Sequence, residues 1–446
     1  MASAPWTMTD DALTPSITPA IVAMHARSGL VGLNVVTAAL DADARTSGLD
    51  IQFVKDAPSM IDALRAAEAE GRRALALWSF YSPDFRAAAK DLAEVKAATS
   101  TARVLHLAGG VHATAEPLAT LQSGFDLVAI GEGEHTMVEI VHALRTGGDP
   151  RDLPGTAHLD PESGRLVSHG PGERFPLDTY PPFNARYRKW NALEITRGCV
   201  YACSFCQTPY MFKARFRHRS IGDVRHHIDR MREHGSRFVR FLTPTSLSYG
   251  SPDTTPDLDA VDALLASVRE GAGADAKIYF GTFPSEIRPE HVTPRALEIL
   301  ARWCDNRTIV IGGQSGSDRI LEQTRRGHSV DDVVRAVELS VKAGFRPDVD
   351  FLLGLPDEEE EDRVASMRLA ERLVAMGARI HSHAFMPLPG TPLRDAVPSP
   401  IEPETMLAMA RLESKGKAYG QWGRQVVTAE DLVRARRGKG RVAKVD

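Results

Sequence analysis

Three of the four cysteines in this chain of 446 residues lie on one short segment, EITRGCVYACSFCQTP, at residues 194–209. Cys199, Cys203 and Cys206 have C-x3-C-x2-C spacing and follow an apolar run that is typical of a strand. Cysteine thiolates bind zinc and iron–sulfur clusters, so this spacing predicts a metal centre.

A four-iron cluster fits three thiolates better than zinc does. Structural zinc takes four ligands, and the remaining Cys304 is distant in the sequence. On a [4Fe-4S] cluster, three protein ligands leave one iron open for a substrate or cofactor. The other alternative is three structural thiols, which are expected on an apolar face rather than in a polar loop. We therefore expect Cys199, Cys203 and Cys206 to hold one cluster.

The elements that must position this loop are strands and helices that alternate between residues 191 and 395. Helical patterns separate six apolar runs, ALEIT, FVRFLTP, KIYFGTF, TIVIGGQS, DVDFLLGLP and ARIHSHAFMP. This alternation predicts a partial (β/α)6 barrel of the TIM type, whose active site lies at the C-terminal ends of the strands. The cysteine segment begins at the end of the first run, where such a site is expected.

Residues 1–150 predict a second α/β domain. Five short apolar runs alternate there with helical patterns, which is typical of a parallel sheet covered on both faces. We predict a flavodoxin-like, Rossmann-type domain that binds its ligand beyond the carboxyl ends of the strands. Residues 151–190 are rich in proline and glycine and are predicted to be a linker with one small hairpin. Residues 396–446 are predicted to form a C-terminal helical segment with a basic tail.

Composition and charge exclude several classes of protein. The formal net charge of −4 argues against nucleic-acid binding and against attachment to a membrane surface. The N-terminus has acidic residues and no apolar core, so we expect no signal peptide, and no apolar run has the length of a transmembrane helix. Four cysteines are too few for a disulfide scaffold, which favours a cytoplasmic protein.

The cysteine segment resembles that of the radical S-adenosylmethionine (SAM) superfamily, because the spacing matches and the aromatic Phe205 precedes the last cysteine. Four further segments resemble the barrel of one subgroup in the expected order: GTFPSEIRPE, IGGQSGSDRILEQTRRGHS, DFLLGLPDE and FMPLPGTPL. The resemblance implies a [4Fe-4S] cluster whose open iron chelates SAM. It also implies a one-electron reductant, such as flavodoxin or ferredoxin, and cleavage of SAM to a 5′-deoxyadenosyl radical.

Polar residues of these segments are candidate contacts to SAM. Glu286, Gln314 and Ser315 could accept hydrogen bonds, and Arg288 could bind the SAM carboxylate. A plain ion pair between Glu286 and Arg288 is the alternative. The family often has Gly-Gly-Glu or Asp-Asp after the second strand, whereas this chain has Thr243, so the group that holds the SAM ammonium stays open. The candidate cofactor contacts in the barrel are Phe205, Thr243, Glu286, Arg288, Gln314 and Ser315.

The N-terminal domain resembles the cobalamin-binding domain that precedes the barrel in one branch of the superfamily, through WSFYSPDF, LAGGVHATAEP and AIGEGEHT. The segment MHARSGLVG departs from the D-x-H-x-x-G pattern whose histidine binds cobalt, and His25 is not assigned as a ligand. Cobalamin held without a protein histidine and a domain that has lost cobalamin both stay open. The candidate contacts are Ser79, Tyr81, Gly109, Gly110, His112, Gly131 and Gly133.

Together the resemblances imply a cobalamin-dependent radical SAM enzyme of the class B methyltransferase type, which methylates an unactivated carbon of a small-molecule substrate. Sulfur insertion is disfavoured, because methylthiotransferases carry a second cluster on N-terminal cysteines and residues 1–198 contain no cysteine. The alternatives are a rearrangement or cyclisation without methyl transfer, and a non-catalytic cobalamin or cluster sensor. His381, His383 and Phe385 share one side of the last strand and are candidates to line the substrate pocket.

Overall fold

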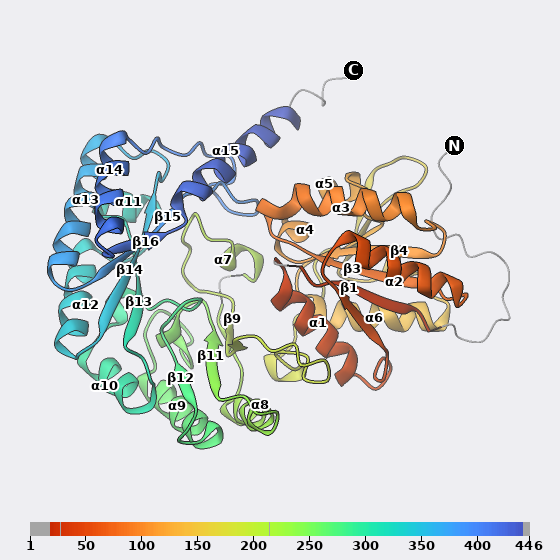
Figure 1. Ribbon diagram of the computed structural model, residues 1–446, viewed down its shortest axis with the longest axis horizontal. Coiled ribbons are helices and arrows are strands. Elements are labelled where there is room, and N and C mark those ends of the chain that lie inside the picture. Colours follow the sequence, from red (N-terminus) through yellow and green to blue (C-terminus); the bar gives the residue numbers. More distant parts are fainter. Residues whose placement is uncertain (1–17, 27, 214, 440–446) are drawn as a thin grey trace. The chain divides into compact units, whose positions relative to one another are not determined.

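The computed structural model describes residues 18–26, 28–213 and 215–439. The chain forms two compact units, one that ends at Asn191 and one that begins at Ala192 (Figure 1). The last residues of the predicted basic tail, 440–446, lie outside the described part. Within the described residues, none of the helices is both long and apolar enough to cross a membrane.

The first unit is built on one twisted sheet. Its described strands have the order β2-β1-β3-β4-β5-β6-β7, and the first five are parallel to one another. The order 2-1-3-4-5 is that of flavodoxin-like folds, which confirms the predicted class. The strands are β1 (Ala20–Met24), β2 (Ile51–Val54), β3 (Ala74–Ser79), β4 (Val104–Gly109), β5 (Leu127–Ala129), β6 (Thr156–Leu159) and β7 (Leu166–Ser168).

The small hairpin expected between residues 151 and 190 is present as β6 and β7. The two strands pair antiparallel, and β6 also pairs antiparallel with β5, so the hairpin extends the edge of the sheet. The turn between them is formed by the segment DPESG, residues 160–164. In it Asp160 accepts hydrogen bonds from the backbone N–H and the hydroxyl of Ser163.

Helices cover both faces of this sheet because side chains alternate along each strand. Val22 belongs to one core with Met60, whereas its neighbour Ile21 belongs to the other core with Leu33 and Ile140. Helices α2 and α3 pack on the first face, and α1 and α6 pack on the second. The helices are α1 (Leu30–Ala42), α2 (Ala57–Ala69), α3 (Phe85–Ala98), α4 (Val111–Ala115), α5 (Pro117–Gln122) and α6 (Gly133–Thr146).

The second unit contains two parallel sheets, ordered β12-β11-β8 and β13-β14-β15-β16. They are linked by a parallel bridge between Ile287 and Ile311 and by a hydrogen bond from Val310 N to Gly281 O, 2.8 Å long. This is the partial barrel that the sequence predicts. The strands are β8 (Leu193–Glu194), β11 (Phe238–Leu242), β12 (Lys277–Tyr279), β13 (Thr308–Gln314), β14 (Arg346–Leu353), β15 (Arg379–Ala384) and β16 (Ala418–Gly420).

Strand β16 adds a parallel neighbour that the sequence pattern did not predict. Its three residues, AYG, are too short for a period-two pattern, and only pairing with the edge of β15 makes them a strand. A separate antiparallel pair, β9 (Thr196–Arg197) and β10 (Arg217–His218), brackets the cysteine loop.

Several helices of the second unit begin at side-chain caps. Ser220, Asp257, Thr293 and Ser329 each accept a hydrogen bond from a backbone N–H of the first turn. The acidic run DEEEED (357–362) leads into α13, where acidic side chains suit the positive end of the helix dipole, and Glu359 and Asp362 form a capping box. The helices are α7 (Thr208–Met211), α8 (Ile221–Glu233), α9 (Leu258–Ala272), α10 (Pro294–Trp303), α11 (Asp318–Gln323), α12 (Val330–Lys342), α13 (Glu360–Ala375), α14 (Pro403–Ser414) and α15 (Trp422–Lys439).

Candidate functional site

The cysteine loop leaves the barrel sheet at the carboxyl end of β8. Gly198 has a positive φ of 82°, and a Cβ there would collide with the backbone oxygen of Arg215, so the turn into the loop requires glycine. Cys199 and Cys203 are buried, Cys206 is half-buried, and all three are free thiols. Burial, with the nearby thiols of Cys206 and Cys203, raises the pKa of Cys199 to about 12. A bound cluster would stabilise the thiolate forms, so the donor set fits iron–sulfur chemistry.

Backbone contacts from distant segments hold this loop. Ser204 donates from its backbone N and its hydroxyl to Thr324 O, at 3.0 and 3.3 Å. The side-chain amide of Gln207 donates to Pro389 O at 2.7 Å. Two of the segments that resemble the radical SAM barrel, IGGQSGSDRILEQTRRGHS and FMPLPGTPL, therefore support the cysteine loop directly.

Arg326 is the cation beside the thiols. Its Nη1 lies 3.6 Å from Cys203 Sγ, and its Nη2 donates to Glu286 Oε1 at 2.8 Å and to Gly312 O at 3.0 Å. Only 4% of Arg326 is exposed, and the charges of Glu286 and Cys203 hold its pKa above the ordinary value although burial alone would lower it. Gly312 leaves the space that the guanidinium fills, since a Cβ there would collide with Nη2. The sequence pattern by itself did not distinguish Arg326 from its neighbours.

Glu286 and Gln314, two of the predicted SAM contacts, lie together at this site. The Gln314 amide donates to Glu286 Oε2 at 3.3 Å, and Gln314 has a positive φ of 69° at the end of β13. Arg326 and Gln314 thus engage the two carboxylate oxygens of Glu286. The structure brings the predicted acceptors to the side of the cysteine loop, at the carboxyl ends of the strands.

Arg288 lies in a different set of contacts. It is 2% exposed, its Nε donates to Glu290 Oε1 at 2.5 Å, and its Nη2 donates to the backbone oxygen of Arg326. Its guanidinium also lies 3.6 Å from the ring centre of Tyr201. The ion-pair partner of Arg288 is therefore Glu290, and the partner of Glu286 is Arg326.

The other predicted barrel contacts are engaged within the protein. The Thr243 hydroxyl donates to Thr245 O at 3.1 Å. The Ser315 hydroxyl lies 3.3 Å from the hydroxyl of Ser366 on α13. Phe205 packs against a small core of Ile320, Leu355 and Phe385, so the aromatic residue before Cys206 anchors the loop.

Asp350, His381 and His383 form a second polar cluster inside the barrel sheet. Asp350 on β14 is the register partner of His381 on β15, and Oδ1 lies 2.7 Å from His381 Nδ1. One ligand atom from each of the three lies within 4.8 Å of the others, a set that could hold a metal ion. Gln425 lies 3.4 Å from His383 Nδ1, and its Oε1 is fixed by Ala384 N, so its amide N–H donates to the ring. These hydrogen bonds orient both imidazole rings.

Burial sets the charges of this cluster. It is the main cause that raises the pKa of Asp350 to about 7, with a further contribution from the neighbouring Glu286. It is also the main cause that lowers the pKa of His383 to about 4. Near neutral pH, Asp350 therefore holds a proton part of the time, and His383 is neutral.

The predicted residues of the first unit gather at the carboxyl ends of β3, β4 and β5. Ser79 ends β3, and a Cβ on Gly110 would lie 2.8 Å from its hydroxyl, so glycine is needed there. At Gly109 an added Cβ would meet no close neighbour, because the nearest atom, on Ala129, would be 3.8 Å away. Tyr81 is 49% exposed. The edge therefore carries small residues, as a broad flat ligand requires.

His112, Gly131 and Gly133 make contacts within this unit. His112 is buried, its Nδ1 lies 2.9 Å from the hydroxyl of Ser82, and its ring stacks on Phe85 with centres 4.2 Å apart. Gly131 has a positive φ of 87°, and its N donates to Thr114 at 3.0 Å. Gly133 begins α6 and lies against Val36 of α1.

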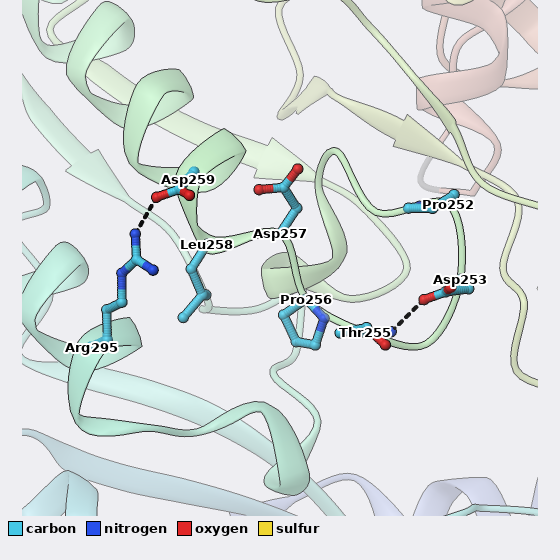
Figure 2. A pocket seen from close by; sticks show the side chains of 8 residues that line it. All are labelled: Pro252, Asp253, Thr255, Pro256, Asp257, Leu258, Asp259 and Arg295. Carbon is cyan, nitrogen blue, oxygen red and sulfur yellow. Dashed lines mark hydrogen bonds and ion pairs between the residues drawn. The ribbon is translucent and has the colours of Figure 1, made fainter.

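A hollow of about 540 Å³ lies before α9 and is lined by acidic residues (Figure 2). Figure 2 shows that its carboxylates already have partners: Asp259 pairs with Arg295, and Asp253 accepts from Thr255 N at 2.7 Å. Asp257 caps α9 through Ala260 N at 2.9 Å. These contacts give the acidic side chains a structural role. None of the residues that line the hollow is a cysteine, so it is separate from the proposed cluster site.

Two family profiles match the chain, one in each unit. The profile described as the radical SAM superfamily matches residues 193–370, and the profile described as the B12 binding domain matches residues 24–141. The chain therefore combines a radical SAM domain with a B12-binding domain. A radical SAM domain implies a [4Fe-4S] cluster and SAM, and a B12-binding domain implies cobalamin. The three free thiols and the small residues at the sheet edge fit these cofactors.

Two solved proteins have the same fold. The radical SAM methyltransferase TsrM from Kitasatospora setae, with cobalamin and a [4Fe-4S] cluster bound, superimposes with a TM-score of 0.63 at 17% identity, over 84% of this chain and 77% of that one. The cobalamin-dependent SAM radical enzyme OxsB gives 0.62 at 14% identity, over 90% and 56%.

The curated relatives match over only part of their length. An uncharacterized protein of Methanopyrus kandleri is 24% identical over 67% of this chain and 64% of its own length. An uncharacterized methyltransferase of Pyrococcus horikoshii is 26% identical over 59% and 57%, and a tRNA-2-methylthio-N(6)-dimethylallyladenosine synthase of Pelobacter propionicus is 26% identical over 54% and 53%. The chain therefore spans between about half and two thirds of these relatives.

Proposed function

We propose that this cobalamin-dependent radical SAM enzyme methylates an unactivated carbon of a small-molecule substrate. The observation that carries the proposal is the set of three free thiols beside a buried arginine in one unit, in a chain whose other unit is a B12-binding domain. The bound cofactors supply the radical and the methyl group. The residues of the chain bind these groups and exclude water.

Cys199, Cys203 and Cys206 are the proposed cluster ligands. Glu286 accepts hydrogen bonds from Gln314 and from Arg326, and Arg326 also contacts Cys203. We propose that Glu286 and Gln314 bind SAM. Arg288 is already engaged by Glu290 and Tyr201, so its predicted bond to the SAM carboxylate would require those contacts to change. The predicted cobalamin contacts Ser79, Gly109 and Gly110 stay part of the proposal.

Cobalamin bound without a protein histidine suits the first unit. His25 follows β1, where the D-x-H-x-x-G histidine would be expected, but its Nε2 lies 2.9 Å from Asn34 Oδ1. Burial lowers the pKa of His25, so the ring is neutral and hydrogen-bonded within its own unit.

The substrate is proposed to face Asp350, His381 and His383. His381 is oriented by Asp350 and stacks on Tyr419 with ring centres 4.5 Å apart, which restricts its rotation. TsrM was solved with a tryptophan substrate, and a small molecule of this kind is what we propose here. The one-electron reductant, a flavodoxin or ferredoxin, and the cytoplasmic location stay predictions.

The test is anaerobic reconstitution of the chain with iron, sulfide and hydroxocobalamin. We expect one [4Fe-4S] cluster per chain, reductive cleavage of SAM to 5′-deoxyadenosine, and loss of both in the variant with alanine at positions 199, 203 and 206. Cys304→Ala is the matched control. Cys304 follows the last residue of α10 and is far from the cysteine loop in the sequence, so its replacement should leave the iron content unchanged.

Three outcomes would overturn parts of the proposal. Full iron content in the triple variant would exclude the thiols as ligands. A chain that binds cofactors but never forms 5′-deoxyadenosine would be a sensor. A product without an added methyl group, with cobalamin bound, would favour rearrangement or cyclisation.

A further inference from the structure

Arg326 is placed to act on the proposed cluster through a sulfur atom. Its Nη1 lies within hydrogen-bond range of Cys203 Sγ, 3.6 Å away, in a pocket where only 4% of the residue is exposed. Its Nε is also buried and makes no hydrogen bond within the described residues, so one N–H remains for a further acceptor at the site.

The site fixes this guanidinium in place. Gly312 provides both a carbonyl acceptor, 3.0 Å from Nη2, and the space that a side chain would fill. Glu286 accepts from the same Nη2 at 2.8 Å. Ser204 bonds to Thr324 O, two residues before Arg326, so the thiol loop and the arginine segment are held together.

A fixed cation beside a cluster ligand changes the energy of reduction. Hydrogen bonds to the sulfurs and net charge around the cluster set its reduction potential. When one electron from Ti(III) citrate enters the cluster, its charge becomes more negative by one unit, and no bond or proton is transferred. A nearby guanidinium stabilises that reduced form more than the oxidised form, and burial reduces the screening of this effect by water.

We propose that Arg326 raises the reduction potential of the cluster through its hydrogen bond to Cys203, and is thus a positioning and tuning residue. The inference depends on the proposed cluster ligation. It assigns to Arg326 a role that does not depend on SAM or on the substrate.

The experiment is a potentiometric titration of the reconstituted full chain, without SAM, followed by the electron paramagnetic resonance signal of the reduced cluster. For Arg326→Met we expect at least a tenfold smaller equilibrium constant for one-electron reduction, which is 59 mV toward negative potential. Arg326→Lys retains the charge but loses the fork geometry, so we expect a smaller shift.

Glu286 requires a separate control, because Arg326→Met removes the cation that pairs with its carboxylate. The comparison of Glu286→Gln with the double variant Glu286→Gln/Arg326→Met isolates the arginine, and the shift should persist. Arg269→Met removes a guanidinium that pairs with Asp305 at 2.7 Å and donates to Trp303 O and Ala276 O rather than to a cysteine of the loop, and should leave the potential unchanged.

Each result is decisive for one claim. If the reduction potential is unchanged in both Arg326→Met and Arg326→Lys, and the cluster is present at parental content, the proposed role of Arg326 is wrong and the cluster assignment still holds. Failure of the parent chain to bind a cluster through its three cysteines would overturn the proposed function instead.

Discussion

At the scale of single residues, burial lowers the pKa of several histidines of this protein. His106 on β4 shows this clearly, because it is completely buried and its Nδ1 accepts a hydrogen bond from Trp78 Nε1 at 3.3 Å. Burial is the main cause that lowers the pKa of His106 to about 3, and the nearby Lys96 contributes. Protonation of Nδ1 would place an uncompensated charge in the core and break the bond to Trp78.

This burial predicts a pH dependence of folding. The folded-state pKa of His106 lies below its unfolded value of 6.5, so its contribution to stability is complete above pH 6.5 and is lost as the pH falls toward 3. We expect His106→Asn to reduce the loss of unfolding free energy between pH 6 and pH 4 by up to about 1.36 kcal/mol per pH unit. Urea titrations of the cofactor-free chain at several pH values measure this slope. The exposed His234, replaced in the same way, is the control, and equal slopes in His106→Asn and parent would contradict the assignment.

At the scale of elements, contacts from elsewhere in the barrel hold the cysteine loop in shape. The loop is too polar to bury an extensive core of its own, and its main apolar anchor is Phe205 against Ile320, Leu355 and Phe385. Further support comes from the hydrogen bonds of Ser204 and Gln207 to backbone oxygens more than a hundred residues away in the sequence.

The Gln207 contact predicts how firmly the loop retains iron. We expect Gln207→Ala to release iron to a strong chelator about fivefold faster than the parent, because a lost hydrogen bond costs about 1 kcal/mol. The overall fold should be unchanged, since Gln207 lies outside the sheets. The rate is measured from the absorbance of the iron–chelator complex after reconstitution. Gln52→Ala, at an exposed position on β2, is the control. Identical release from Gln207→Ala and the control would show that the loop does not need this support.

At the scale of the whole molecule, each unit has its own sheet or sheets and its own proposed cofactors. The first unit presents the ends of β3, β4 and β5, and the second unit presents the thiol loop with Arg326. A cofactor that binds the folded unit stabilises it by mass action, so its effect should be greatest in the segments that contact it.

Hydrogen–deuterium exchange of the full chain tests whether each unit binds its own cofactor. We expect hydroxocobalamin to slow exchange in residues 79–82, 109–114 and 130–134, by an amount that grows with its concentration. Reconstitution of the cluster should slow exchange in residues 199–207 and 324–328. Cobalamin that binds without protecting any of the three segments in the first unit would contradict the predicted contacts. The hairpin of β6 and β7, on the edge of the same sheet, is the internal control.

The amino-acid sequence alone was sufficient for the fold class, for the strands of the two units apart from β16 and the short pair β9–β10, and for the presence of three cysteines in one loop. These features depend on local patterns, since period-two and helical apolar patterns encode the βα units and three thiols stand at fixed spacing in one loop. The tertiary structure alone decided which charged groups meet the thiols. Arg288 was selected from its segment, but the fold directs it to Glu290 and Tyr201, and directs Arg326 to Cys203 and Glu286. Adjacent Arg325 and Arg326 are equivalent in a sequence, and only the turn after α11, where Arg325 has a positive φ of 56°, separates them. Strand β16 is a similar case, because three residues become a strand only when the edge of β15 is available to accept their hydrogen bonds.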